Sequence, residues 1–437
     1  MLNLVLKSHR THLKAQTAEP QKLFVMLRFI PERNVAQTRP PLALALVIDT
    51  SSSMRNEVDG TVKLDRAIQA AHKLVDDSAL CPEDKITIIQ FDEKSKVLLP
   101  LSPLKREKVH QVIDTLSQYS GGTQMGEGMR NALHQLGKEP PEVAKRLILL
   151  TDGETFDEED CRALASQLAA TNTPIISIGI GEEYNQNLLL ELSDATKGRS
   201  LHLQNMQQLD QFFSQEVQQA VREVVTDLRL KVQTVRGVTV DAITRVYPNL
   251  VEVPLGDQPY RLGNIAAGDY TIFIMELTVS GVPRPPCRAR LAQLTLWASA
   301  PSLKQRQVEF PPKELFVTFT DDETAIAQVN PEVLDYVQQK NVDNQLAQAT
   351  RLLAQGKMQE ARQTLQAALQ STQRLNNPGQ IRLLQNALEE LNRTGTLSEG
   401  TRRTLRAGGR TMTVKSGKTE PLETGMSDEE IRRQTGA

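Results

Sequence analysis

The chain has 437 residues, a formal net charge of −2 and three cysteines. Its length exceeds what one hydrophobic core usually serves, so two or three domains are expected. The balanced charge argues against nucleic acid or an anionic membrane as a partner, because both need a clear basic excess. Cys81, Cys161 and Cys287 are far apart and lack Cys-x-x-Cys spacing, which favours neither a disulfide framework nor a zinc site.

The first ten residues hold only a short apolar stretch before Lys7 and Arg10, with neither a charged leading region nor a small-residue cleavage site. No later stretch approaches the ~20 apolar residues that a membrane span requires. We therefore expect a cytoplasmic protein without a membrane partner. Residues 2–6 and 23–29 are apolar and β-branched, and they predict strands that precede any helix.

The middle third alternates strand-like and helix-like segments. Residues 42–48, 86–91, 147–150 and 175–180 are short apolar runs without polar alternation, as strands buried on both faces should be. Amphipathic helical spacing recurs over residues 64–75, 109–116 and 164–168, with a further helix expected after Gln204. Residues 95–99 and 199–203 are predicted as the two outer strands. This pattern predicts an α/β fold with a doubly wound, mostly parallel sheet.

After the α/β region the pattern changes to polar–apolar alternation interrupted by Gly and Pro, which indicates a half-buried antiparallel sheet. The predicted strands are residues 225–232, 238–246, 270–279, 288–297 and 314–319. We infer that they join the N-terminal strands in one β-sandwich into which the α/β domain is inserted.

From about Asp321 the composition becomes rich in Gln and Ala, with apolar stripes at helical spacing that predict a small helical bundle. Residues 352–361 are similar to the turn of a tetratricopeptide repeat, but a solenoid needs at least three such units. Thr394–Ala437 has few large apolar residues, so disorder is expected there. Thr404 and Thr411 lie beside arginines, which would suit a kinase or a phosphothreonine reader, although a solvated tail is the simpler explanation.

The predicted domains are therefore residues 1–40 (N-terminal strands of the sandwich), 41–216 (α/β domain), 217–320 (remainder of the sandwich), 321–395 (helical domain) and 396–437 (disordered tail).

Hard oxygen donors follow two of the predicted buried strands. Asp49, Ser51 and Ser53 follow the run 42–48 in the pattern Asp-x-Ser-x-Ser, and Asp152 follows the run 147–150 and precedes Gly153. Between them Thr123 ends the loop Gly121-Gly122-Thr123. Carboxyl ends of parallel strands meet at one edge of a sheet, so these side chains are expected to converge there.

This order of residues resembles the metal-ion-dependent adhesion site of von Willebrand factor A domains, over roughly residues 41–216. The resemblance implies that Ser51, Ser53 and Thr123 contact the ion directly or nearly so, while Asp49 and Asp152 act largely through water. An inserted A domain in a β-sandwich also resembles several bacterial proteins of this family.

Oxygen ligands without soft donors suit Mg²⁺, with Mn²⁺ able to replace it. Two carboxylates only neutralise the ion, so its remaining position invites an Asp or Glu from a protein partner. The sequence thus predicts a metal-dependent protein-binding adaptor and not an enzyme, since no activated nucleophile or general base accompanies the site. The alternative is a scaffold in which the metal is only structural and the helical domain and the Thr-rich tail do the binding.

Other patterns near the site have simpler explanations. Gly121, Gly122, Gly126 and Gly128 are not followed by Gly-Lys-Ser/Thr, which argues against a phosphate-binding loop. The acidic residues from Glu154 to Asp160 suit the start of a helix through its dipole, or else form a rim that tunes partner choice.

Overall fold

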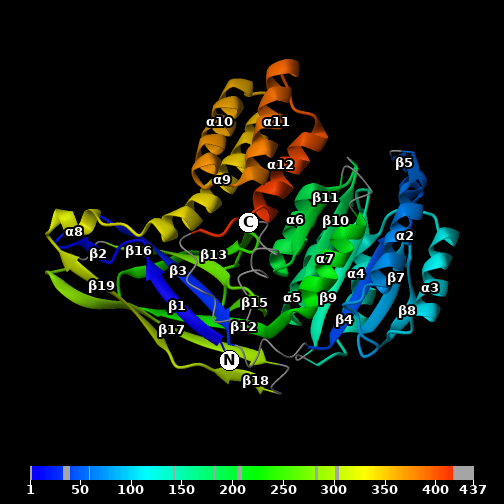
Figure 1. Ribbon diagram of the computed structural model, residues 1–437, viewed down its shortest axis with the longest axis horizontal. Coiled ribbons are helices and arrows are strands. Elements are labelled where there is room, and N and C mark those ends of the chain that lie inside the picture. The colour runs from blue at the N-terminus through cyan, green and yellow to red at the C-terminus, as the bar shows by residue number, and fades with distance from the viewer. Residues whose placement is uncertain are drawn as a thin grey trace. The chain divides into compact units, whose positions relative to one another are not determined.

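The computed structural model describes residues 2–32, 40–58, 60–140, 143–181, 183–203, 209–280, 284–300 and 305–416 (Figure 1). These residues fall into two compact units. One takes its residues from 38–227 and 299–306, and the other from 1–37, 228–298 and 307–437.

The first unit is built on a six-stranded sheet with the order β11-β10-β9-β4-β7-β8. Its strands are β4 (Leu42–Asp49), β7 (Lys85–Phe91), β8 (Ser95–Pro103), β9 (Ala144–Thr151), β10 (Ile175–Ile180) and β11 (Arg199–Leu203). All neighbours pair in parallel except β7 and β8, which are antiparallel. After β4 the chain adds β7 and β8 on one side of that strand, and then adds β9, β10 and β11 on its other side. The direction in which strands are added therefore reverses between β4 and β9.

Helices cover both faces of this sheet. One face packs against α2 (Lys63–Val75), α3 (Arg106–Asp114) and α7 (Leu209–Val221), and the other against α4 (Met125–Leu136), α5 (Glu158–Ala170) and α6 (Gln186–Ala195). Strand β4 serves both layers, because Leu44 and Leu46 enter the first apolar cluster while Ala45 and Val47 enter the second. The predicted doubly wound α/β fold is confirmed, although the predicted helices included no range for α4 or α6.

The second unit contains two further sheets. The five-stranded sheet has the order β1-β3-β16-β13-β14, and the six-stranded sheet the order β15-β12-β17-β19-β2, with β18 also paired to β17. The strands are β1 (Leu2–Ser8), β2 (His12–Lys14), β3 (Gln21–Pro31), β12 (Glu223–Thr234), β13 (Val238–Tyr247), β14 (Val251–Glu252), β15 (Tyr260–Ala266), β16 (Thr271–Val279), β17 (Cys287–Ala300), β18 (Gln305–Glu309) and β19 (Lys313–Thr320). Strands from the two sides of the α/β region therefore pair directly, β3 with β16 and β2 with β19.

The helical region comprises α8 (Glu323–Ala327), α9 (Pro331–Ala354), α10 (Met358–Arg374), α11 (Pro378–Thr394) and α12 (Glu399–Thr411). Apolar side chains of the last four helices form one core, which includes Leu346, Leu365, Leu384 and Leu405. The first turns of α9 belong to a different cluster, because Val333 and Tyr336 pack with residues of β3 and β16.

The disorder predicted for residues 396–437 is wrong for residues 396–416. Helix α12 begins after Ser398, whose hydroxyl caps the Thr401 amide, and it buries Leu405 in the helical core. Gly408 and Gly409 let the helix approach its neighbours, since a Cβ at these positions would lie 2.5 Å from Leu383 and 2.8 Å from Leu346. A helix with few apolar residues can therefore be ordered where its glycines permit close contact with neighbouring helices. The prediction for residues 417–437 lies outside the described residues.

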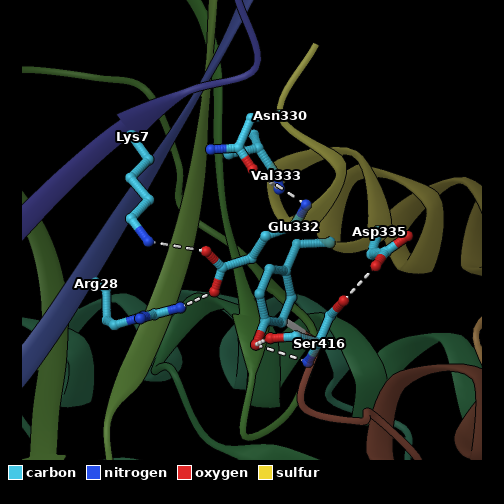
Figure 2. Close-up of polar contacts among 8 residues, drawn as sticks. Lys7, Arg28, Asn330, Glu332, Val333, Asp335 and Ser416 are labelled. Atoms are coloured by element: carbon cyan, nitrogen blue, oxygen red, sulfur yellow. Dashed lines mark hydrogen bonds and ion pairs between the residues drawn. The ribbon is translucent and has the colours of Figure 1, made fainter. Parts of the chain in front are cut away.

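A buried ion pair attaches the start of α9 to the five-stranded sheet (Figure 2). Glu332 accepts a hydrogen bond from Lys7 of β1 at 3.1 Å and pairs with Arg28 of β3. The Arg28 and Glu332 side chains are only 8% and 13% exposed. Arg28 also lies over the Tyr270 ring, 5.0 Å from its centroid. About one turn further along the helix, Ser416 bonds to Tyr336 and Asp335.

Of the described helices, none combines the length and the apolar character needed to cross a bilayer. The predicted cytoplasmic location stays a prediction.

Glu332→Gln should loosen α9 from the sheet. The substitution keeps the size of the side chain but leaves the Arg28 charge buried without its carboxylate, a change that costs about 3 kcal/mol. Amide hydrogen exchange should therefore speed up in α9 and β3 while β4 and β9 stay unchanged. Glu360→Gln is the matched control, because its side chain is 59% exposed and pairs with Lys357 at 3.8 Å. Equal exchange in the two variants would contradict the prediction.

Candidate metal centre

Asp49 is the last residue of β4, and its carboxylate is held on both oxygens. Oδ1 accepts the Ser51 amide at 2.8 Å, and Oδ2 accepts the Thr151 hydroxyl at 2.6 Å. The intervening Thr50 points the other way and donates to Gln90 of the neighbouring strand at 2.9 Å. This turn places Asp49 and Ser51 on the same side of the strand end.

The two strand ends are joined by a chain of hydroxyl and carboxylate contacts. The Ser51 and Ser53 hydroxyl oxygens are 3.1 Å apart, and the Ser53 hydroxyl donates to Asp152 Oδ1 at 2.7 Å. The short helix after Ser51 (Ser52–Arg55) positions Ser53, and it is anchored by Met54, which is fully buried. Four of the five predicted ligands thus form one connected group.

Thr123 reaches the same place from a third loop. Its carbonyl accepts the Phe156 amide at 3.3 Å and the Thr155 hydroxyl at 3.2 Å, which fixes this loop to the one that carries Asp152. A Cβ on Gly153 would lie 3.8 Å from the Thr123 hydroxyl and 3.7 Å from the Ser53 hydroxyl. The two hydroxyls therefore lie close to the same backbone position, and all five predicted residues come together at the carboxyl ends of β4 and β9.

Glycines in the Thr123 loop and at the start of α4 leave room for acidic side chains that approach closely. A Cβ at Gly121 would be 3.2 Å from the Asp92 side chain, and one at Gly126 would be 2.6 Å from Asp157 Oδ2. The Gly126 amide donates to the same Asp157 oxygen at 2.9 Å. The glycines therefore allow tight packing of this loop, in line with the absence of a phosphate-binding motif.

Lys63 contributes a charge that the sequence did not reveal. Its ammonium lies 2.7 Å from Asp152 Oδ2, and the two side chains are 7% and 0% exposed. Lys63 opens α2, where a cation opposes the helix dipole. A lysine at this unfavourable helix position was the signal available in the sequence. Asp152 thus faces Ser53 with one oxygen and Lys63 with the other.

Burial raises the pKa of Asp49 to about 6, although its hydrogen bonds from Thr151 and Ser51 act in the opposite direction. The carboxylate therefore lacks a nearby cation that would compensate fully for its removal from water. A dication would supply that compensation.

The donor set fits a hard cation. It consists of three hydroxyls and two carboxylates, the oxygen ligands that Mg²⁺ prefers. Among the described residues there is no group of three or more His, Cys, Asp and Glu side chains that could hold a metal, so the candidate centre depends on its hydroxyls.

Residues 43–215 match the family model of the von Willebrand factor type A domain, and residues 331–415 match the Sll0103-like, C-terminal alpha-helical domain. The α/β region is therefore a von Willebrand factor type A domain, a class whose members are in general protein-interaction modules.

The uncharacterized protein sll0103 of Synechocystis sp. is 23% identical over 415 residues, which cover 93% of this chain and 95% of that protein. YfbK of Escherichia coli is 22% identical over 270 residues, 60% of this chain and 46% of that protein.

Two solved structures share most of the fold. A von Willebrand factor type A protein from Catenulispora acidiphila has a TM-score of 0.80 at 18% identity, covering 94% of this chain and 97% of that one. The ArnB paralog VWA2 from Sulfolobus acidocaldarius has a TM-score of 0.61 at 19% identity, covering 95% and 100%. At these identities the likeness concerns the fold alone.

Lys63→Met should destabilise the metal-free domain, because Asp152 would keep its buried charge without the ammonium. A loss of about 3 kcal/mol is expected, which lowers the thermal midpoint by roughly 6–12 °C for a domain of this size. The measurement is thermal denaturation in the presence of a chelator. Lys73→Met, on the same helix, is the control, since its side chain is 62% exposed. A midpoint that falls equally in both variants would contradict the role given to Lys63.

Proposed function

We propose that this protein is a metal-dependent protein-binding module in which Asp49, Ser51, Ser53, Thr123 and Asp152 hold Mg²⁺, or Mn²⁺ in its place. The observation that carries the proposal is the convergence of these five side chains from three separate loops at the ends of β4 and β9. When bound, the ion offers an electrophilic position that an Asp or Glu of a partner protein can occupy.

The charges of the site support capture of an anionic group. Asp49 and Asp152 together carry two negative charges, and Lys63 offsets one of them through its 2.7 Å contact with Asp152. A dication at this site would leave a local positive excess of one charge, which favours a further carboxylate ligand. Lys63 thus strengthens the attraction for an acidic partner.

A binding function, and not turnover, fits the surroundings of the site. The ionisable groups nearest its hydroxyls are Asp152, which accepts the Ser53 hydroxyl at 2.7 Å, and Asp49, and both are fully buried and held by neighbouring side chains. Neither is placed as an exposed general base beside a nucleophile.

In the alternative function, the protein is a scaffold whose helical domain and phosphorylatable Thr-rich tail bind the partner. The Thr404 hydroxyl donates to the Gly400 carbonyl at 2.9 Å inside α12, and Thr411 does the same to Ala407 at 3.0 Å. A kinase would have to unwind this helix before reaching either hydroxyl. The structure therefore favours the metal site over these threonines as the place of partner binding.

Asp49→Asn should abolish the stabilisation of the domain by Mg²⁺. Ligand that binds only the folded state at a hundred times its Kd adds about 2.7 kcal/mol of stability, and the substitution removes one of the two carboxylates at nearly constant size. Thermal midpoints with Mg²⁺ and with chelator give the difference. Asp65→Asn, an exposed acid of the same domain, should keep the full Mg²⁺ effect. If Asp49→Asn is stabilised as much as the unchanged protein, the assigned metal site is wrong.

Partner capture should follow the same pattern. A pull-down from native lysate should retain partners in Mg²⁺ and release them on chelation, and the Asp49→Asn protein should retain few in either condition. Partners held equally by both proteins in chelator would favour the scaffold function.

A further inference from the structure

A large apolar side chain projects into solvent beside the metal centre. Phe156 is 86% exposed, while no other large hydrophobic side chain among the described residues exceeds 42%. A single exposed apolar residue needs no explanation in general. The position of this one, four residues after Asp152, and its support by the surrounding loops set it apart.

The residues on either side of Phe156, Thr155 and Asp157, are held by hydrogen bonds. The Thr155 hydroxyl donates to the Thr123 carbonyl at 3.2 Å and accepts the Met125 amide at 3.0 Å. Asp157 accepts the Gly126 amide at 2.9 Å. With Thr155 and Asp157 both fixed to the loop and helix that follow Thr123, the ring between them is held outward on an ordered backbone.

The ring also lies close to a ligand-bearing loop. The Phe156 amide donates to the Thr123 carbonyl at 3.3 Å, and Cε2 of the ring is 4.0 Å from the position of a Cβ on Gly122. A partner protein whose carboxylate binds at the metal centre would therefore place the residues next to that carboxylate against the Phe156 ring.

The charged side chains around the ring are mainly acidic. Glu154 precedes Phe156 by two residues and is exposed, and the exposed Glu93 approaches the same glycine loop, with its Cβ 3.7 Å from the Cβ position of Gly122. A partner that fits this rim carries positive charge around its acidic residue.

We propose that Phe156 is the apolar anchor of the partner-binding surface, and that it selects a protein loop in which one Asp or Glu is flanked by bulky apolar residues within a basic stretch. The inference rests on the proposed function, because the metal centre supplies the contact for the carboxylate. Exposed aromatic rings on a rigid support bury much apolar area at little entropic cost, which is why they dominate binding energy at interfaces.

The test uses labelled peptides and the full-length protein in saturating Mg²⁺. One peptide has a single Asp between two Leu residues in a Gly, Ser and Lys background, a second has Gly in place of both Leu residues, and a third has Asn in place of Asp. Fluorescence anisotropy gives each affinity. The unchanged protein should bind the Leu-flanked peptide at least tenfold more tightly than the Gly-flanked one, which corresponds to about 1.4 kcal/mol.

Phe156→Ser should reduce this preference to less than about threefold while leaving Mg²⁺ binding, measured by calorimetry, unchanged. Phe316→Ser, at an exposed phenylalanine of the other unit, should keep the preference. A peptide with Gln in place of its Lys residues should bind more weakly than the Lys version, and equal binding would overturn the basic part of the proposal.

The outcomes separate the two proposals. Mg²⁺-dependent binding of the Asp peptides without a Leu preference, or with a preference that survives Phe156→Ser, overturns the role of Phe156 and leaves carboxylate capture standing. If the Asp peptides bind no better than the Asn peptide, carboxylate capture itself is wrong, and the inference falls with it.

Discussion

The parallel pairing of β4 with β9 is the constraint on which the candidate metal centre depends. Their register sets Ile48 opposite Leu150, so that Asp49 at the end of one strand faces the end of the other, where Thr151 and Asp152 follow. The Thr151 hydroxyl then bonds to Asp49, and Asp152 reaches Ser53. A shift of one residue would turn every side chain of the shifted strand to the opposite face of the sheet and would break both contacts. The apolar packing on the two faces of β4 enforces the register, since each face must present its own set of side chains to its own helices.

The site could be predicted from the sequence where the positions of its residues follow from strand ends and from their spacing along the chain. Asp49, Ser51 and Ser53 lie within one turn, and Asp152 follows a buried run, so general rules for parallel sheets bring them together. Lys63 was not predicted because its partner is far away in sequence, and a lysine near a helix start usually lies in solvent. The exposure of Phe156 also could not be deduced, since it depends on hydrogen bonds that fix its two neighbours to another loop.

Fold prediction failed where long-range packing overrides composition. The segment around α12 has few apolar residues, and its order comes from Leu405 entering a core built by three other helices and from glycines that permit close approach. Helix α6 escaped notice because its leucines run consecutively, at Leu188, Leu189 and Leu190, without a clear helical period. The central strands β4, β9 and β10, by contrast, are buried along their whole length, and their continuous apolar runs, alternating with amphipathic helices, predicted a parallel sheet.

The pairing of β3 with β16 has a consequence for synthesis of the protein. Strand β3 emerges from the ribosome early, yet its partner β16 begins only at Thr271, after the complete von Willebrand factor type A domain has been made. The A domain can therefore fold first as a unit, while one edge of the β1–β3 pair waits with unsatisfied backbone groups. During translation this early edge is open to aberrant strand pairing until the second half of its sheet has been made.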